Sequence, residues 1–163
     1  MRLEGSCHCG AVTFTVDSRT PYPYLRCYCS ICRKTAGGGG YAINIMALTS
    51  TLKVRGRKHL GVYHARLGID EDGHEEISPG RRHFCRECAS ALFIWDPRWP
   101  RWVYPFASAI DTPLPKPPER VHVLLDSIAP WVERPRSGKH DRCFAEYPDE
   151  AIIQWHRRHG LYG

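Results

Sequence analysis

Seven of the eight cysteines in this chain fall into three short clusters, and their spacing constrains the fold more than any other feature. The clusters are the pair Cys7 and Cys9, the triplet Cys27, Cys29 and Cys32, and the pair Cys85 and Cys88. In an extended C-x-C segment both side chains lie on one face, and a C-x-x-C turn converges two sulfurs on one point. Sulfurs arranged in this way favour a metal ion, and zinc in particular.

Two pairs and one triplet suggest two different zinc sites. A structural zinc takes four ligands in a tetrahedron, which the two pairs would supply: Cys7, Cys9, Cys85 and Cys88. This site would join segments roughly 75 residues apart and would substitute for missing core in a small, loop-rich domain. The triplet leaves the fourth position of a zinc ion open, which is the arrangement of a catalytic site: Cys27, Cys29 and Cys32.

Spacing alone does not fix which clusters share an ion, so two alternatives stay open. In the first, all seven cysteines hold structural zinc, with Cys143 or a histidine as an eighth ligand. In the second, the cysteines form disulfides. Residues 1–10 contain no apolar segment typical of a secretion signal, so we expect a cytoplasmic protein with reduced thiols. Cys143 itself is interpreted as a small buried hydrophobic residue.

Length and composition predict a single domain over residues 1–163. Hydrophobic residues make up 42% of the chain, which is enough for one core. No stretch approaches the ~18 apolar residues that a membrane helix needs. The formal charge of +6 is compatible with an anionic small molecule, but the basic residues are dispersed, which argues against nucleic acid as a partner. The sequence does not indicate an oligomeric state.

Short strands dominate the expected secondary structure. Apolar and polar residues alternate from Val12 to Asp17, and further strands are expected at Tyr41–Met46, Val62–His64, Leu92–Trp95, Trp102–Tyr104 and Val121–Leu125. Surface loops are expected at Leu67–Arg82, Thr112–Arg120 and Glu133–Arg142. A helix is expected at Pro148–Gly160, with acids in its first turn and Gly160 at the C′ position. The sequence thus predicts a mainly β fold with long loops and a C-terminal helix.

With these residues identified, the chain resembles the glutathione-dependent formaldehyde-activating enzyme family, which also includes centromere protein V. The resemblance rests on the segments GSCHCGAVTFTV, CYCSICRKTAG, FCRECASAL, ASAIDTP, HVLLDSIAPWVE and QWHRRHGL. It implies a zinc-bearing β-tent fold and the same division into one structural and one catalytic zinc. Two residues depart from the family pattern: Tyr28 stands where histidine is frequent, and Ala89 where glycine is usual.

The resemblance also implies an activity. The family joins glutathione to formaldehyde, which gives S-(hydroxymethyl)glutathione, so we expect a zinc-dependent carbon–sulfur lyase acting on glutathione and an aldehyde. Arg33 and Lys34 follow the triplet and are candidates for binding the carboxylates of glutathione, although they would equally offset the charge of a trithiolate zinc. The alternative functions are a non-enzymatic zinc-stabilised module that binds protein or nucleic acid, and a redox enzyme on a related scaffold.

Overall fold

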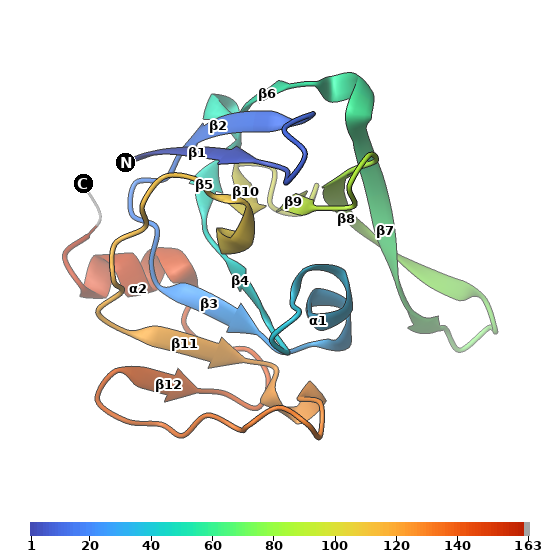
Figure 1. Ribbon diagram of the computed structural model, residues 1–163. Helices are drawn as coiled ribbons and strands as arrows, with labels where there is room; N and C mark the ends of the chain where they lie inside the picture. Colours follow the sequence, from blue (N-terminus) through green and yellow to red (C-terminus); the bar gives the residue numbers. More distant parts are fainter. Residues whose placement is uncertain (162–163) are drawn as a thin grey trace.

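The computed structural model describes residues 1–161, which form three β-sheets and two short α-helices (Figure 1). The first sheet has the strand order β1-β2-β6 and is antiparallel: β1 (Arg2–Ser6), β2 (Thr13–Asp17) and β6 (Lys53–Arg55). The predicted alternation from residue 12 to 17 is confirmed, because Phe14 and Val16 are buried while Thr13 and Thr15 are half-buried. Phe14 packs edge-to-face on Phe93 of the second sheet at a centroid distance of 5.5 Å, which joins the two sheets in one core.

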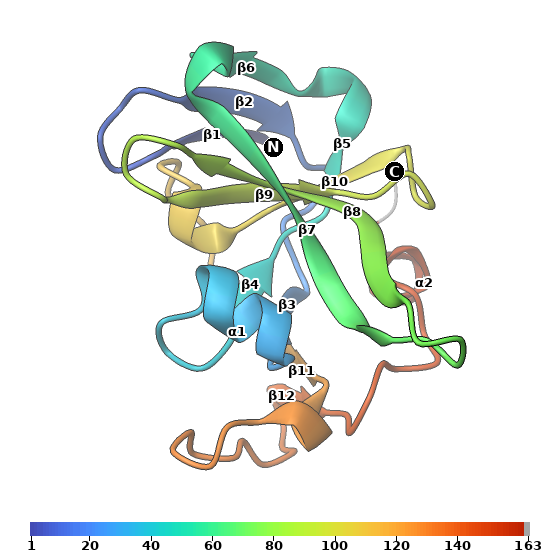
Figure 2. The ribbon, with the colours of Figure 1, turned by 90° about the vertical axis from the view of Figure 1, so that its right-hand side faces the viewer.

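The second sheet is antiparallel and has the order β5-β10-β9-β8-β7. Its strands are β5 (Ala47–Leu48), β7 (Leu60–Ile69), β8 (Glu75–Cys85), β9 (Ala91–Trp95) and β10 (Trp102–Pro105). The long β7–β8 hairpin extends away from the rest of the molecule in Figure 1 and is directed toward the viewer in Figure 2.

This hairpin corrects one expectation, since Leu67–Arg82 was predicted to be a surface loop. Most of that segment is paired strand, and only residues 70–74 turn. The Asp70 carboxylate accepts hydrogen bonds from the backbone N–H groups of Asp72 and His74, and Gly73 adopts a φ of 82°, which makes the turn tight. The prediction was wrong because both faces of the distal hairpin are exposed, so no hydrophobic alternation marks the strands.

The third sheet has the order β12-β11-β3-β4: β3 (Tyr24–Cys27), β4 (Ala42–Asn44), β11 (Arg120–Val123) and β12 (Asp141–Cys143). Strand β11 lies parallel to both β3 and β12, and β4 is antiparallel to β3. The two faces of the third sheet differ in chemistry. Val121 and Val123 pack with Cys27 on one face, whereas Arg120 and His122 line a cavity on the other.

Of the two helices, only the C-terminal one was predicted from the sequence. Helix α1 (Ser30–Ala36) follows β3 and was not expected. Helix α2 (Ile152–Arg158) is shorter than the predicted Pro148–Gly160. It begins later because the Gln154 side chain accepts the Ala151 N–H, which fixes the first turn there. Gly160 follows the C-cap residue with a φ of 65°, as predicted for C′.

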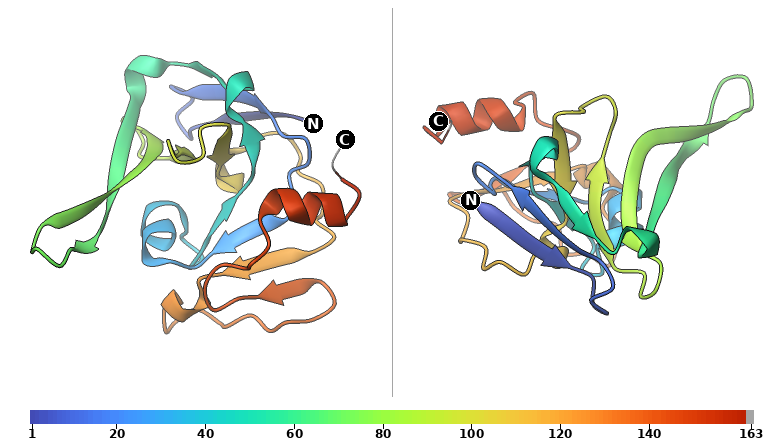
Figure 3. Two further views of the ribbon diagram at one scale, coloured as in Figure 1. Left: turned by 180° about the vertical axis from the view of Figure 1, so that it is seen from behind. Right: turned by 90° about the horizontal axis from the view of Figure 1, so that it is seen from above.

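Helix α2 packs behind the third sheet, as the rear view in Figure 3 shows. Trp155 donates a hydrogen bond of 2.9 Å from Nε1 to Glu119 Oε1, and both Trp155 and His156 are buried.

Short 3₁₀ turns complete the fold at Thr49–Thr51, Arg57–His59, Ala107–Ala109 and Leu125–Ser127. Within residues 1–161 no helix has the length and apolar character that crossing a bilayer requires.

Candidate functional site

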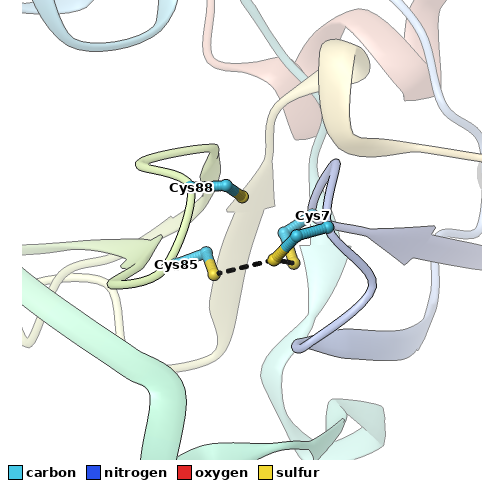
Figure 4. Close-up of side chains that lie close together, drawn as sticks. Cys7, Cys85 and Cys88 are labelled. Atoms are coloured by element: carbon cyan, nitrogen blue, oxygen red, sulfur yellow. Dashed lines mark hydrogen bonds between the residues drawn. The ribbon is translucent and has the colours of Figure 1, made fainter.

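Four cysteines from two distant segments bring their sulfurs together beside the first sheet. Cys7 and Cys9 lie in the loop between β1 and β2, while Cys85 ends β8 and Cys88 lies in the following turn. Figure 4 shows the side chains of Cys7, Cys85 and Cys88 close together. All four Sγ atoms lie within 4.8 Å of one another. The Sγ–Sγ distance is 3.6 Å between Cys7 and Cys9 and 3.7 Å between Cys9 and Cys85.

The two loops hold these sulfurs through backbone hydrogen bonds. The Cys7 carbonyl accepts from the Gly10 N–H, so the first pair lies in a tight turn and not in the extended strand assumed from its spacing. The Val12 N–H donates to Cys7 Sγ at 3.2 Å, and His8 N–H donates to the Ser90 hydroxyl at 3.1 Å. The loops are therefore tied both to the sulfurs and to each other.

Hydrogen bonds within this cluster lower the pKa of one cysteine and raise the pKa of another. The pKa of Cys88 is lowered to about 5, chiefly because the Ser90 side chain and backbone donate to its sulfur. The pKa of Cys9 is raised to about 12, since the neighbouring sulfurs of Cys88 and Cys7 outweigh the favourable backbone hydrogen bond of Ala11. Several thiolates cannot coexist here without a cation to balance them.

The donor set fits zinc. Zinc–sulfur bonds of about 2.3 Å place the sulfurs of a tetrahedron about 3.8 Å apart, close to the 3.6 and 3.7 Å observed between Cys7, Cys9 and Cys85. Cys7 and Cys85 are buried, Cys88 is half-buried and Cys9 is exposed, so the cluster lies at the edge of the core. These four cysteines can therefore hold a metal ion with every position of the tetrahedron filled.

One departure from the family pattern, Ala89, lies at a left-handed position of a turn. Ala89 follows Cys88 with a φ of 59°, a left-handed conformation that costs an L-residue with a Cβ atom more than it costs glycine. Its N–H donates to the Cys85 carbonyl at 2.8 Å, which closes the turn. The turn thus retains its geometry with alanine, at an energetic cost.

The other three cysteines gather on the inner face of the third sheet. Cys27 is the last residue of β3, Cys29 caps the N-terminus of α1, and Cys32 lies in its first turn. Their Sγ atoms also lie within 4.8 Å of one another. The Cys32 N–H donates to Cys29 Sγ at 3.3 Å, so the start of the helix orients the triplet.

The triplet consists of three ligands only in the described part of the chain. Among residues 1–161, no further histidine, cysteine, aspartate or glutamate places a donor atom within 4.8 Å of all three sulfurs. Cys143 lies half-buried on β12 and belongs to neither cluster. Three soft donors on a buried apolar floor can hold a zinc ion and leave one coordination position for another molecule.

Hydrogen bonding concentrates negative charge on one thiol of the triplet. The pKa of Cys29 is lowered to about 2, because the sulfurs of Cys27 and Cys32 hydrogen-bond to it. The pKa of Cys27 is raised, since it hydrogen-bonds to the other two sulfurs and is buried. These hydrogen bonds favour an ionised thiol within the triplet, which is the form in which cysteine binds a metal ion.

Arg82 is a residue of this site that the sequence reasoning missed. It lies on β8, within the segment expected to be a loop, and its Nη2 atom is 3.6 Å from Cys32 Sγ. Its Nη1 atom donates to Thr35 Oγ1 of α1 at 3.3 Å. No local motif signals this contact, because only the fold brings the hairpin over the start of α1.

The residues predicted to bind glutathione lie on α1. Lys34 is exposed, and Arg33 is half-buried with an Nε atom that has no hydrogen-bond partner within residues 1–161. Tyr28, between Cys27 and Cys29, is buried, and its hydroxyl lies 3.0 Å from His122 Nδ1. Its side chain lines a cavity together with His122 and is therefore directed away from the sulfurs.

Comparisons with known proteins identify the family of this chain. The profile of the family "Glutathione-dependent formaldehyde-activating enzyme" matches residues 2–123. A Halomonas elongata protein named "Putative glutathione-dependent formaldehyde-activating enzyme" is 61% identical over 161 residues, which cover 99% of this chain and 98% of that protein. A crystal structure of a Rhodobacter sphaeroides protein superposes with a TM-score of 0.51 at 27% identity, covering 69% of this chain and 91% of the other. The chain therefore belongs to the glutathione-dependent formaldehyde-activating enzyme family.

Proposed function

We propose that this protein is a zinc-dependent carbon–sulfur lyase that forms and cleaves the adduct of glutathione and formaldehyde. The observation that carries the proposal is the triplet Cys27, Cys29 and Cys32, which gathers three sulfurs and has no fourth ligand within residues 1–161. Family membership supports the choice of glutathione and formaldehyde, as does the name of the Halomonas relative.

In this proposal the two clusters have separate roles. The four-sulfur cluster holds a structural zinc and the triplet holds a catalytic one, so each chain carries two ions. A zinc ion on the triplet would supply positive charge that lowers the pKa of a bound thiol and polarises an aldehyde oxygen. The domain that carries both sites spans residues 1–163.

The reaction needs one bond to form and one proton to be relocated. The glutathione thiol gives up its proton, its sulfur bonds to the carbonyl carbon of formaldehyde, and the carbonyl π electrons move to oxygen, which takes a proton. The three cysteines fix the place of the reacting sulfur, and the Arg82 guanidinium lies beside Cys32 to balance the negative charge. Arg33 and Lys34 bind the two carboxylates of glutathione and so orient it.

Metal content and exchange kinetics test the proposal together. Protein purified without oxygen should contain two zinc ions per chain, and a chelator should remove one of them faster. NMR exchange measurements on a mixture of formaldehyde and glutathione should show faster adduct formation with protein than without. Cys29→Ser should abolish this acceleration and leave the circular dichroism spectrum unchanged.

The matched control is Cys143→Ser, since Cys143 lies outside both clusters. It should keep both zinc ions and full activity. A single zinc per chain would contradict the catalytic site. Unfolding of Cys29→Ser as complete as that of Cys88→Ser would favour two structural sites.

The role of Arg33 and Lys34 has its own test. Substitution of either by glutamine should raise the KM for glutathione by roughly tenfold, because a charge-assisted hydrogen bond to a carboxylate is lost. The kcat should change little, since neither residue is assigned to the bond-forming step. A fall in kcat with KM unchanged would contradict the assignment.

A further inference from the structure

A cavity of about 690 Å³ lies on the face of the third sheet opposite the three-sulfur triplet. Strand alternation separates the two sites. Along β3, Cys27 packs on the inner face while its neighbours Arg26 and Tyr28 line the cavity, and β11 repeats this pattern with Arg120 and His122. The loop of residues 132–136 closes one side. The volume lies within the range of small-molecule sites, and the sheet keeps its contents apart from the sulfurs.

The cavity is positively charged. Its four arginines face two carboxylates, which leaves two positive charges: Arg26, Arg120, Arg134 and Arg136 against Glu133 and Asp141. Asp141 is already engaged, because its carboxylate accepts from Arg120 and His122. In contrast, neither Arg26 nor Arg136 forms an ion pair within the described part of the chain.

Arg26 is held in place without being neutralised. Its guanidinium lies over the Tyr41 ring at 5.0 Å from the centroid, and its Nε atom is buried with no hydrogen-bond partner within residues 1–161. A buried donor without a partner is costly. An acceptor supplied by a ligand would remove that cost, so this arginine is oriented for an anion that the protein itself does not provide.

A chain of hydrogen bonds stiffens the cavity floor. The Asp141 carboxylate can only accept, so His122 donates to it from Nε2 over 2.8 Å. Nδ1 of the neutral imidazole then accepts from the Tyr28 hydroxyl over 3.0 Å. Tyr28 and His122 are each 2% exposed, so their rings are fixed by packing. This arrangement prepares the site before any ligand arrives.

We propose that this cavity is a second ligand site, which binds a small molecule carrying two negative charges on carboxylate or phosphate oxygens. Arg26 and Arg136 bind the anionic groups, because they are the two arginines that no carboxylate neutralises. Tyr41 and Val132 provide apolar wall for the rest of the ligand. The site is separate from the thiol chemistry and does not depend on the proposed lyase activity.

Calorimetric titration of the zinc-loaded protein with inorganic phosphate and with succinate tests the proposal. At least one of the two should bind in one-to-one stoichiometry, and the better binder identifies the anionic group that the site prefers. Arg26→Gln and Arg136→Gln should each weaken that binding roughly tenfold, since each removes one charge-assisted hydrogen bond. Arg136 is exposed, so its substitution leaves the fold unaffected.

Two controls make the result decisive. Arg57→Gln removes an exposed arginine outside the cavity and should leave binding unchanged. Cys29→Ser should also leave it unchanged, which separates this site from the lyase site. The proposal is overturned if neither anion binds below about 10 mM, a dissociation constant at which a built site would already be marginal. It is also overturned if Arg57→Gln weakens binding as much as the two cavity variants do.

Discussion

The Nη2 atom of Arg82 lies 3.6 Å from the Sγ atom of Cys32, although 50 residues separate them in sequence. A zinc ion bound by three thiolates carries a net negative charge, and a fixed guanidinium beside one sulfur offsets it. Arg82 also donates to Thr35 on the same helix, which fixes its position. The charge balance of the triplet thus depends on the β7–β8 hairpin.

Arg82→Gln should therefore weaken zinc binding by the triplet without unfolding the protein. We expect chelators to remove the more labile zinc several-fold faster, and kcat/KM to fall roughly tenfold, because one charge-assisted contact of about 1.4 kcal/mol is lost. Arg82→Lys should recover part of the loss. Arg81→Gln is the matched control, since the Arg81 guanidinium lies over the Trp95 ring at 5.1 Å. Equal effects at both positions would contradict the charge-balance role.

Cys88→Ser should destabilise the whole chain, whereas Cys143→Ser should not. Cys88 completes the four-sulfur cluster that joins the β1–β2 loop to the end of β8, while Cys143 belongs to neither cluster. Loss of one structural ligand should lower the free energy of unfolding by about 3 kcal/mol or more. Urea unfolding followed by circular dichroism measures both variants. Similar midpoints for Cys88→Ser and the unmodified chain would rule out a structural metal at this cluster.

Ala89→Gly should stabilise the protein. Ala89 has a φ of 59°, where glycine avoids the steric cost of a Cβ atom, and the expected gain is about 1 kcal/mol. For a chain of this size that gain raises the Tm by about 2–4 °C. Ala145→Gly is the control: Ala145 is exposed and has no positive φ, so glycine there should lower the Tm slightly. A lower Tm for Ala89→Gly would contradict the strain argument.

The stability of the protein should fall as the pH drops below the usual histidine pKa of about 6.5, and His156 should contribute to the loss. Its pKa is lowered because burial disfavours the charged ring, an effect larger than the opposing hydrogen bond with the Tyr22 carbonyl. The unfolded chain therefore binds a proton in this range before the folded chain does. The free energy of unfolding then decreases toward acid pH, by at most about 1.4 kcal/mol per pH unit for one group.

Unfolding in urea at pH 7.5 and pH 5.5 measures this dependence. The comparison with His156→Gln isolates one residue, because any loss of zinc at acid pH affects both proteins. The variant should be less stable at pH 7.5 but should lose less stability between the two values. Equal losses in the two proteins would contradict a role for His156.

The two cysteine clusters were predictable because metal ligation imposes its own local pattern. Close spacing places two or three sulfurs near one point whether the backbone is a strand, as assumed for Cys7 and Cys9, or the turn that is observed. The predicted grouping of the sulfurs therefore stays correct even where the predicted secondary structure is wrong. The buried alternation of β2 was predictable for a related reason, since one face of that strand contacts the core.

Arg82 and the cavity on the third sheet were not predictable, because both depend on which strands become neighbours. The parallel placement of β11 beside β3 sets His122 next to Tyr28, and β12 then brings Asp141 to the same face. No short motif in the sequence encodes this order. The hairpin that carries Arg82 was also hidden, since its distal residues are exposed on both faces and lack a hydrophobic period.

Strand β8 serves both cysteine clusters at once. Cys85 at its end belongs to the four-sulfur cluster, and Arg82, three residues earlier, contacts the triplet. Three steps along a strand span about 10 Å, so a backbone segment of about that length connects the two sites. Damage to the first cluster, by an oxidant or by a competing soft metal, would release the strand that positions Arg82. Loss of the four-sulfur cluster should therefore abolish the proposed activity together with the fold.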